Sequence, residues 1–150
     1  MTDHELHMTR ALELARLQQG RTASNPSVGC VILDRHGDKI SEAATGDGGR
    51  PHAEQLALSK VSEDAARGGI AYVTLEPCRQ RSSGEPSCSE RLKDAGIAQV
   101  FVASLDPHPL GAGGNDRLRD AGIEVEVGLL RDQSDDFYTD FFAAAASEQS

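Results

Sequence analysis

The stretch IAYVTLEPC, residues 70–78, holds the clearest local pattern in the chain. Residues 70–75 are rich in β-branched and aromatic side chains, which predicts a strand, and Pro77 ends it. Cys78 comes directly after the proline, so its thiol is expected where a strand gives way to a loop. The polar run 79–86 that follows predicts the loop itself.

Strands and helices alternate on both sides of this stretch. A capping box at Thr2 and Glu5 opens a stripe of apolar residues at helical spacing, and Gly20 stops it. The pattern predicts strands at 28–33, 39–43, 70–75, 99–104 and 123–127, further helices at 52–61, 88–95, 116–121 and 131–147, and a Gly-rich loop at 45–51. Strands separated by helices predict an α/β fold, here a three-layer α/β/α sandwich with a mixed five-stranded sheet. Apolar and acidic residues alternate in the last strand, which predicts an edge position.

Length and composition predict one domain over residues 1–150. The formal net charge of −9 argues against a dedicated nucleic-acid partner, which needs a basic surface. No apolar run approaches the ~18 residues of a membrane-spanning helix, so no membrane partner is expected and a cytoplasmic location is predicted. Three cysteines are too few for a disulfide scaffold, and spaced Cys and His residues in a cytosolic chain more often indicate metal binding or catalysis.

His52, Cys78 and Cys88 form a candidate metal site, because each falls at the boundary of a predicted element. Helix N-termini favour anions, so a thiolate at such a place is a ready ligand. One His and two Cys ligands suit Zn²⁺ and leave the fourth tetrahedral position for water, which is typical of a catalytic site. Glu54 lies two residues after His52 and is the candidate general acid and base. A purely structural zinc site is the alternative, and it is disfavoured because only three strong ligands are present.

Several segments resemble the cytidine-deaminase superfamily, and most closely the deaminase domain of the bacterial bifunctional riboflavin-biosynthesis deaminase/reductase. The matching segments are ALELARL (11–17), SNPSVGCVIL (24–33), PHAE (51–54), AYVTLEPC (71–78), PSC (86–88), AGIAQVFVASLDPHPLGAG (95–113) and LRDAGIEVEVGLL (118–130). The resemblance covers about residues 8–130. The spacing of Cys78 and Cys88 also fits that branch, whereas deaminases that edit nucleic acid have the short C-x-x-C.

The resemblance implies that His52, Cys78 and Cys88 bind zinc, that Glu54 moves protons, and that Asn25 and Asp106 lie beside the substrate. Read from the residues alone, Asn25 and Asp106 could instead be turn formers before a proline. Three positions depart from the family pattern and are predicted substrate contacts that bear on specificity: Thr45 and Gln80 stand where the family has histidines, and His108 replaces an asparagine.

The chemistry is therefore predicted to be hydrolytic deamination of a small aminated heterocycle. The resemblance gives the diaminopyrimidinone ribosylamino phosphate of riboflavin biosynthesis as the default substrate. Another aminopyrimidine, purine or pterin base or nucleoside is the first alternative, and a non-catalytic zinc-folded partner subunit is a lower one. No reductase domain is expected, and the resemblance suggests a homodimer or homotetramer. The aromatic residues Phe137, Phe141 and Phe142 are expected to pack the last helix on the chain's own sheet.

Overall fold

The protein is seen in a computed structural model that describes residues 1–78, 86–107 and 113–149, with side chains described as far as residue 144. Its elements in chain order are α1 (Asp3–Gln18), β1 (Gly29–Leu33), β2 (Lys39–Ala44), the 3-10 turn η1 (Asp47–Gly49), α2 (Ala53–Ser59), β3 (Ile70–Leu75), α3 (Cys88–Asp94), β4 (Gln99–Ser104), α4 (Gly114–Asp120), β5 (Glu124–Val127), α5 (Arg131–Phe137) and α6 (Thr139–Gln149). No helix within these ranges is long and apolar enough to cross a bilayer.

The five strands form one mixed sheet in the order β2-β1-β3-β4-β5. Strand β1 runs antiparallel to both β2 and β3, and β3, β4 and β5 run parallel to one another. The predicted mixed five-stranded sheet is therefore confirmed. Strand β5 stands at an edge with mostly exposed residues, as the alternation of apolar and acidic side chains predicts.

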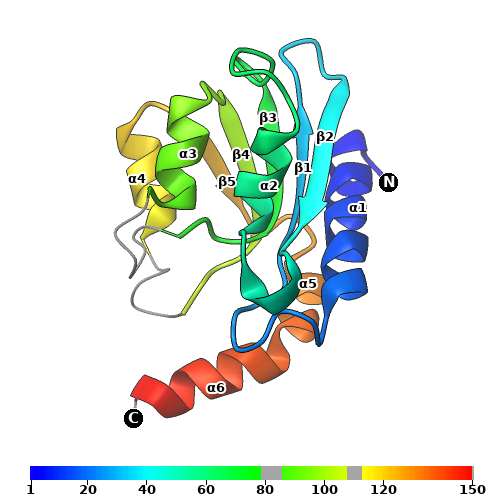
Figure 1. The fold of residues 1–150 in the computed structure, drawn as a ribbon, viewed down its shortest axis with the longest axis vertical. Coiled ribbons are helices and arrows are strands. Elements are labelled where there is room, and N and C mark those ends of the chain that lie inside the picture. Colours follow the sequence, from blue (N-terminus) through cyan, green and yellow to red (C-terminus); the bar gives the residue numbers. More distant parts are fainter. Residues whose placement is uncertain (79–85, 108–112, 150) are drawn as a thin grey trace.

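Helices cover both faces of this sheet, which confirms the three-layer α/β/α class (Figure 1). All five residues of β1 are buried, and successive side chains enter opposite layers. Cys30 and Ile32 join the cluster that contains Ala57 of α2, Leu92 of α3 and Leu118 of α4. On the other face, the cluster consists of Met8 and Ala11 of α1 together with Val31, Leu33, Tyr72, Phe101 and Ala103. Cys30 is thus the fully buried core thiol that its apolar strand indicates.

The terminal helix expected at 131–147 is wrong as a single helix, because the chain turns at Tyr138 between α5 and α6. Tyr138 is 2% exposed, and its hydroxyl donates to the carbonyl oxygen of Ser27 at 2.6 Å and contacts Thr74 Oγ1 at 2.7 Å. The turn lets this ring enter the protein, whereas Phe137, Phe141 and Phe142 are only half-buried around it. Tyr138, rather than the phenylalanines, is the buried aromatic side chain of this segment.

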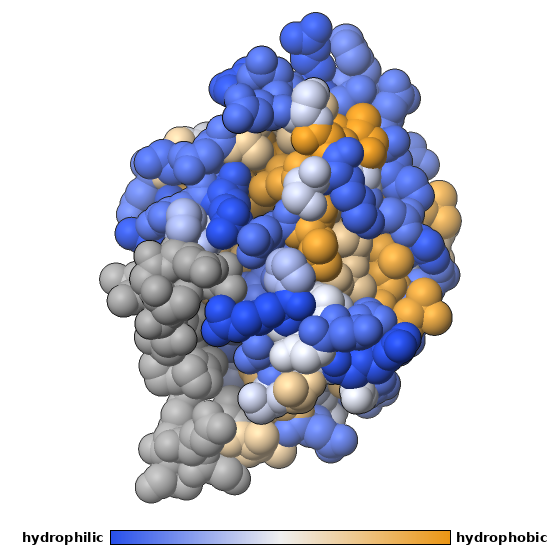
Figure 2. Space-filling view, in the orientation of Figure 1, coloured by the Kyte–Doolittle hydropathy of each residue, from blue (hydrophilic) through white to orange (hydrophobic). Residues whose placement is uncertain are grey.

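Other boundaries differ by a few residues. Helix α4 begins at Gly114, earlier than the expected 116, and α2 ends at Ser59, before the expected 61. The predicted loop 45–51 contains η1. Much of the face seen in Figure 2 is hydrophilic, with hydrophobic side chains gathered in its upper centre and toward its right side. On α2 and β2, Leu56, Leu58 and Ile40 pack against the core and stay partly exposed.

Candidate metal centre and active site

The structure brings His52, Cys78 and Cys88 together from three separate segments. His52 is the N-cap of α2, Cys78 follows β3 after Pro77, and Cys88 opens α3 after its N-cap Ser87. The side chain of Ser87 accepts the N–H of Glu90, which fixes where α3 begins. Sequence reasoning placed the three residues at element boundaries. Because β1 is antiparallel to both β2 and β3, the chain leaves β2 and β3 at the same end of the sheet, and the segments that lead to His52 and Cys78 begin there.

The three ligand atoms fit one small cation. The imidazole Nδ1 of His52 lies 3.3 Å from Cys88 Sγ and 3.9 Å from Cys78 Sγ, and all three atoms lie within 4.8 Å of one another. Zinc bonds of about 2.3 Å to sulfur and about 2.0 Å to nitrogen place tetrahedral ligand atoms about 3.5–3.8 Å apart. A borderline-soft ion is also the kind that one imidazole and two sulfurs select. The residues present therefore fit Zn²⁺.

The two thiols differ in their electrostatics. A hydrogen bond from Cys88 lowers the pKa of Cys78, and the backbone N–H of Cys88 also donates to Cys78 Sγ at 3.2 Å. The same hydrogen bond, together with burial, raises the pKa of Cys88. Cys78 is thus the sulfur that most readily carries a negative charge before a metal arrives, because donors surround it.

Glu54 lies in the first turn of α2, two residues from His52, and is only 3% exposed. Burial raises the pKa of its carboxyl group, and the charge of His52 opposes that rise. Hydrogen bonding with Cys88 is a further, smaller influence that lowers the pKa of this carboxyl group. A carboxylate beside a metal cluster, shielded from water and shifted toward the protonated form, has the environment expected of a group that accepts and returns protons.

Asn25 and Thr45, two of the predicted substrate contacts, form hydrogen bonds to backbone groups. The amide of Asn25 donates from Nδ2 to the carbonyl oxygen of Gly49 at 3.0 Å, so it supports the segment that leads to His52. Thr45 is 2% exposed, and its hydroxyl oxygen accepts the N–H of Val28 at 2.9 Å. Their contact with a substrate stays a prediction, and for Thr45 the hydroxyl already has backbone partners.

Of the three remaining predicted contacts, the structure describes Asp106. Asp106 is half-buried just after β4, and its backbone N–H donates to Glu76 Oε1 at 3.2 Å. Gln80 and His108 lie outside the described residues. Glu76 itself was missed by sequence reasoning: it sits directly before Pro77 and is 7% exposed. A carboxylate inside a strand-ending TLEPC stretch was the available signal, since a buried carboxylate needs donors.

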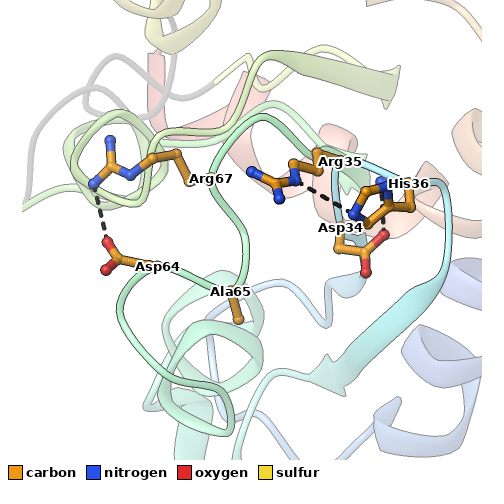
Figure 3. A pocket seen from close by; sticks show the side chains of 6 residues that line it. All are labelled: Asp34, Arg35, His36, Asp64, Ala65 and Arg67. Carbon is orange, nitrogen blue, oxygen red and sulfur yellow. Dashed lines mark hydrogen bonds and ion pairs between the residues drawn. The ribbon is translucent and has the colours of Figure 1, made fainter.

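A hollow of about 490 Å³ lies elsewhere, beyond the carboxyl end of β1 and before the start of β3 (Figure 3). Its lining residues are Asp34, Arg35, His36, Asp64, Ala65 and Arg67. The charged groups pair with near neighbours in the chain: Arg67 lies 3.4 Å from Asp64, and Arg35 Nε donates to His36 Nε2 at 3.3 Å. Because β1 and β3 are antiparallel, this hollow lies at the opposite end of the strands from Cys78.

Comparison with known proteins points to the same site. The sequence model of the family described as "Cytidine and deoxycytidylate deaminase zinc-binding region" matches residues 1–104, a span that contains all three ligand candidates and Glu54. The chain is similar to the "Diaminohydroxyphosphoribosylamino-pyrimidine deaminase" of Buchnera aphidicola (subspecies Acyrthosiphon pisum), with 39% identity over 137 residues that cover 91% of each chain.

Two longer relatives are similar to this chain over part of their length. The "Riboflavin biosynthesis protein RibD" of Aquifex aeolicus is 40% identical over 144 residues, 95% of this chain and 40% of that protein. The crystal structure of a diaminohydroxyphosphoribosylaminopyrimidine deaminase/5-amino-6-(5-phosphoribosylamino)uracil reductase from Thermotoga maritima superposes with a TM-score of 0.89 at 32% identity. That superposition covers 97% of this chain and 42% of the other. The chain thus spans about two fifths of the length of these relatives.

The fold and the His/Cys/Cys cluster define a protein of the zinc-binding deaminase class. With the family match over most of its length, the chain belongs to the cytidine and deoxycytidylate deaminase zinc-binding family. The family resemblance, the deaminase class and zinc as cofactor, each predicted from the sequence, are confirmed.

Proposed function

We propose that this chain catalyses hydrolytic deamination of the diaminopyrimidinone ribosylamino phosphate of riboflavin biosynthesis, and that residues 1–150 act as a single deaminase domain. The observation that carries the proposal is the buried Glu54 carboxylate beside the His52, Cys78 and Cys88 cluster. The substrate rests on the printed names of the Buchnera and Aquifex relatives. The Buchnera deaminase supports the single domain, because this chain aligns with 91% of its length.

The chain's own residues would divide the work as follows. His52, Cys78 and Cys88 would hold zinc, which when bound makes water a competent nucleophile at neutral pH. Glu54 would take a proton from the attacking water and deliver it to a ring nitrogen of the substrate, and would then move a second proton from the added hydroxyl group to the departing amine. Water adds at the amino-bearing ring carbon, the C–N bond breaks, and ammonia leaves while the ring retains the oxygen. The burial of Glu54 keeps this proton transfer away from bulk solvent.

The test is ammonia release from that pyrimidine phosphate by zinc-loaded protein, with Glu54→Gln as the blank. We expect the variant to keep its zinc and to lose about 10²–10⁴-fold in kcat, because an amide cannot accept the water proton. Glu124→Gln on the exposed part of β5 is the matched control and should turn over as the parent does. Equal rates in the parent and Glu54→Gln would remove Glu54 from the mechanism.

A substrate series separates the alternatives that the sequence left open. The same assay with the dephosphorylated nucleoside and with free aminopyrimidine, purine and pterin bases identifies which part of the substrate is needed. Loss of kcat/KM on removing the phosphate supports the proposed substrate. Turnover of a free base alone would instead favour deamination of another heterocycle. A homodimer or homotetramer and a cytoplasmic location also stay predictions, and light scattering of the purified protein measures the first.

A further inference from the structure

One buried carboxylate outside the metal cluster has partners that come from far along the chain. Glu76 Oε1 accepts the backbone N–H of Asp106 at 3.2 Å. Its Oε2 accepts the backbone N–H of Gly113 and that of Asn115, each at 3.1 Å. The side chain is 7% exposed, so these three hydrogen bonds replace the water that a carboxylate would otherwise bind.

The chemistry of this arrangement requires a carboxylate. An ionised Glu offers acceptors on both oxygens and no donor, which matches three N–H groups that converge on it. A glutamine of the same shape has one acceptor oxygen, and its NH₂ group would face at least one backbone N–H. Glu76→Gln therefore keeps the volume of the side chain and removes part of the hydrogen bonding. That property makes it a sharper probe than deletion of the side chain.

The same segments are also in close packing contact. Gly114 lies so near Pro77 that a Cβ atom on it would collide with the Pro77 carbonyl oxygen. Residues 113–115 thus rest directly on the segment that carries Cys78. Gly113 has a φ of 94°, in the left-handed region that favours glycine, and the carboxylate of Glu76 accepts N–H groups on both sides of this close approach. These contacts give a reason for α4 to begin at Gly114 rather than at the expected 116.

We propose that Glu76 is a positioning residue that holds Asp106 and residues 113–115 against the Cys78 segment and thereby sets the affinity for substrate. It would act through the backbone of Asp106, the residue predicted to lie beside the substrate, and would not touch the reacting atoms. We expect its replacement to leave metal binding intact, because none of its three hydrogen-bond partners is a ligand candidate. The kinetic part of this inference rests on the proposed function.

The first experiment measures KM, kcat and zinc content for Glu76→Gln and Glu76→Ala with the pyrimidine phosphate. We expect KM to rise about tenfold in Glu76→Ala and by less in Glu76→Gln, with kcat within about twofold of the parent and zinc content unchanged. Glu124→Gln again serves as the control, since its carboxylate is on the exposed edge strand. If Glu76→Ala does not fold, the isosteric Glu76→Gln decides.

The second experiment needs no substrate. Residue-resolved hydrogen exchange of zinc-loaded parent and Glu76→Gln should show faster exchange at one or more of the Asp106, Gly113 and Asn115 amides, and no change at amides of β1. Unchanged exchange at all three amides would overturn the proposal, and so would an unchanged KM or a loss of zinc that parallels the loss of activity. If the parent does not deaminate the pyrimidine phosphate, the proposed function fails, and the exchange data still decide the role of Glu76.

Discussion

Charged and polar side chains gather at both ends of the strands of the central sheet, but their contacts differ between the two ends. At the end with Cys78, called the metal end below, Glu76 is buried and bonds to the backbone of Asp106, which is distant in sequence. At the opposite end, the hollow is lined mostly by exposed groups that form ion pairs or hydrogen bonds with near neighbours in the chain, as Asp64 does with Arg67. A buried polar group costs free energy unless its partners are held in place, whereas an exposed pair contributes little. The metal end of the sheet, and not the hollow, is therefore where this fold concentrates its chemistry.

The largest effect on activity and stability should come from removing the His52 imidazole at the metal end. We expect His52→Ala to lose its zinc and its turnover, and to unfold at lower urea because bound metal stabilises only the folded state, by about 4 kcal/mol when its free concentration is 1,000 times Kd. Zinc content and urea unfolding with and without chelator measure this. His36→Ala in the opposite hollow is the matched control, and a chelator should destabilise it as it does the parent. Full zinc in His52→Ala would contradict the ligand assignment.

A smaller effect on stability is expected for the buried Tyr138 hydroxyl near the metal end. Tyr138→Phe removes the donor to the Ser27 carbonyl and the contact with Thr74, so unfolding free energy should fall by about 1–3 kcal/mol. The chain's other tyrosine is the control: Tyr72→Phe loses a hydroxyl that contacts the exposed His4, and the loss should be smaller. Equal stability losses of the two variants in urea unfolding would show that burial of the partner does not set the cost of removing these hydroxyls.

The smallest effect on stability is expected in the hollow at the opposite end of the strands. Arg67→Ala breaks a pair whose side chains are 63% and 85% exposed, so its unfolding free energy should stay within about 0.5 kcal/mol of the parent. Turnover should be unchanged as well, because the hollow is at the other end of β3 from Cys78. A loss above about 1 kcal/mol in urea unfolding, or a clear change in kcat/KM, would show that the hollow contributes more than its local pairs indicate.

Much of the architecture could be predicted because it depends on neighbouring residues. The capping box of Thr2 and Glu5 is present as expected, and the strands Ile70–Leu75 and Gln99–Ser104 have the predicted bounds. Local propensity and periodicity are properties of a short window, so they survive in the folded chain. The last helix was predicted wrongly as one helix for the opposite reason: a contact between Tyr138 and Ser27, which are far apart in sequence, lies where the chain turns.

The candidate site divides in the same way. The types and order of His52, Glu54, Cys78 and Cys88 already specified a metal with an acid–base partner, because ligand chemistry is a property of side-chain type. Their approach to within 4.8 Å, for the three ligand atoms, came from the antiparallel pairing of β1 with both β2 and β3 and from the placement of α2 and α3 on one face. The partners of Glu76 were decided only there as well. A backbone N–H carries no sequence signature, so which of them a buried carboxylate meets depends on the tertiary fold.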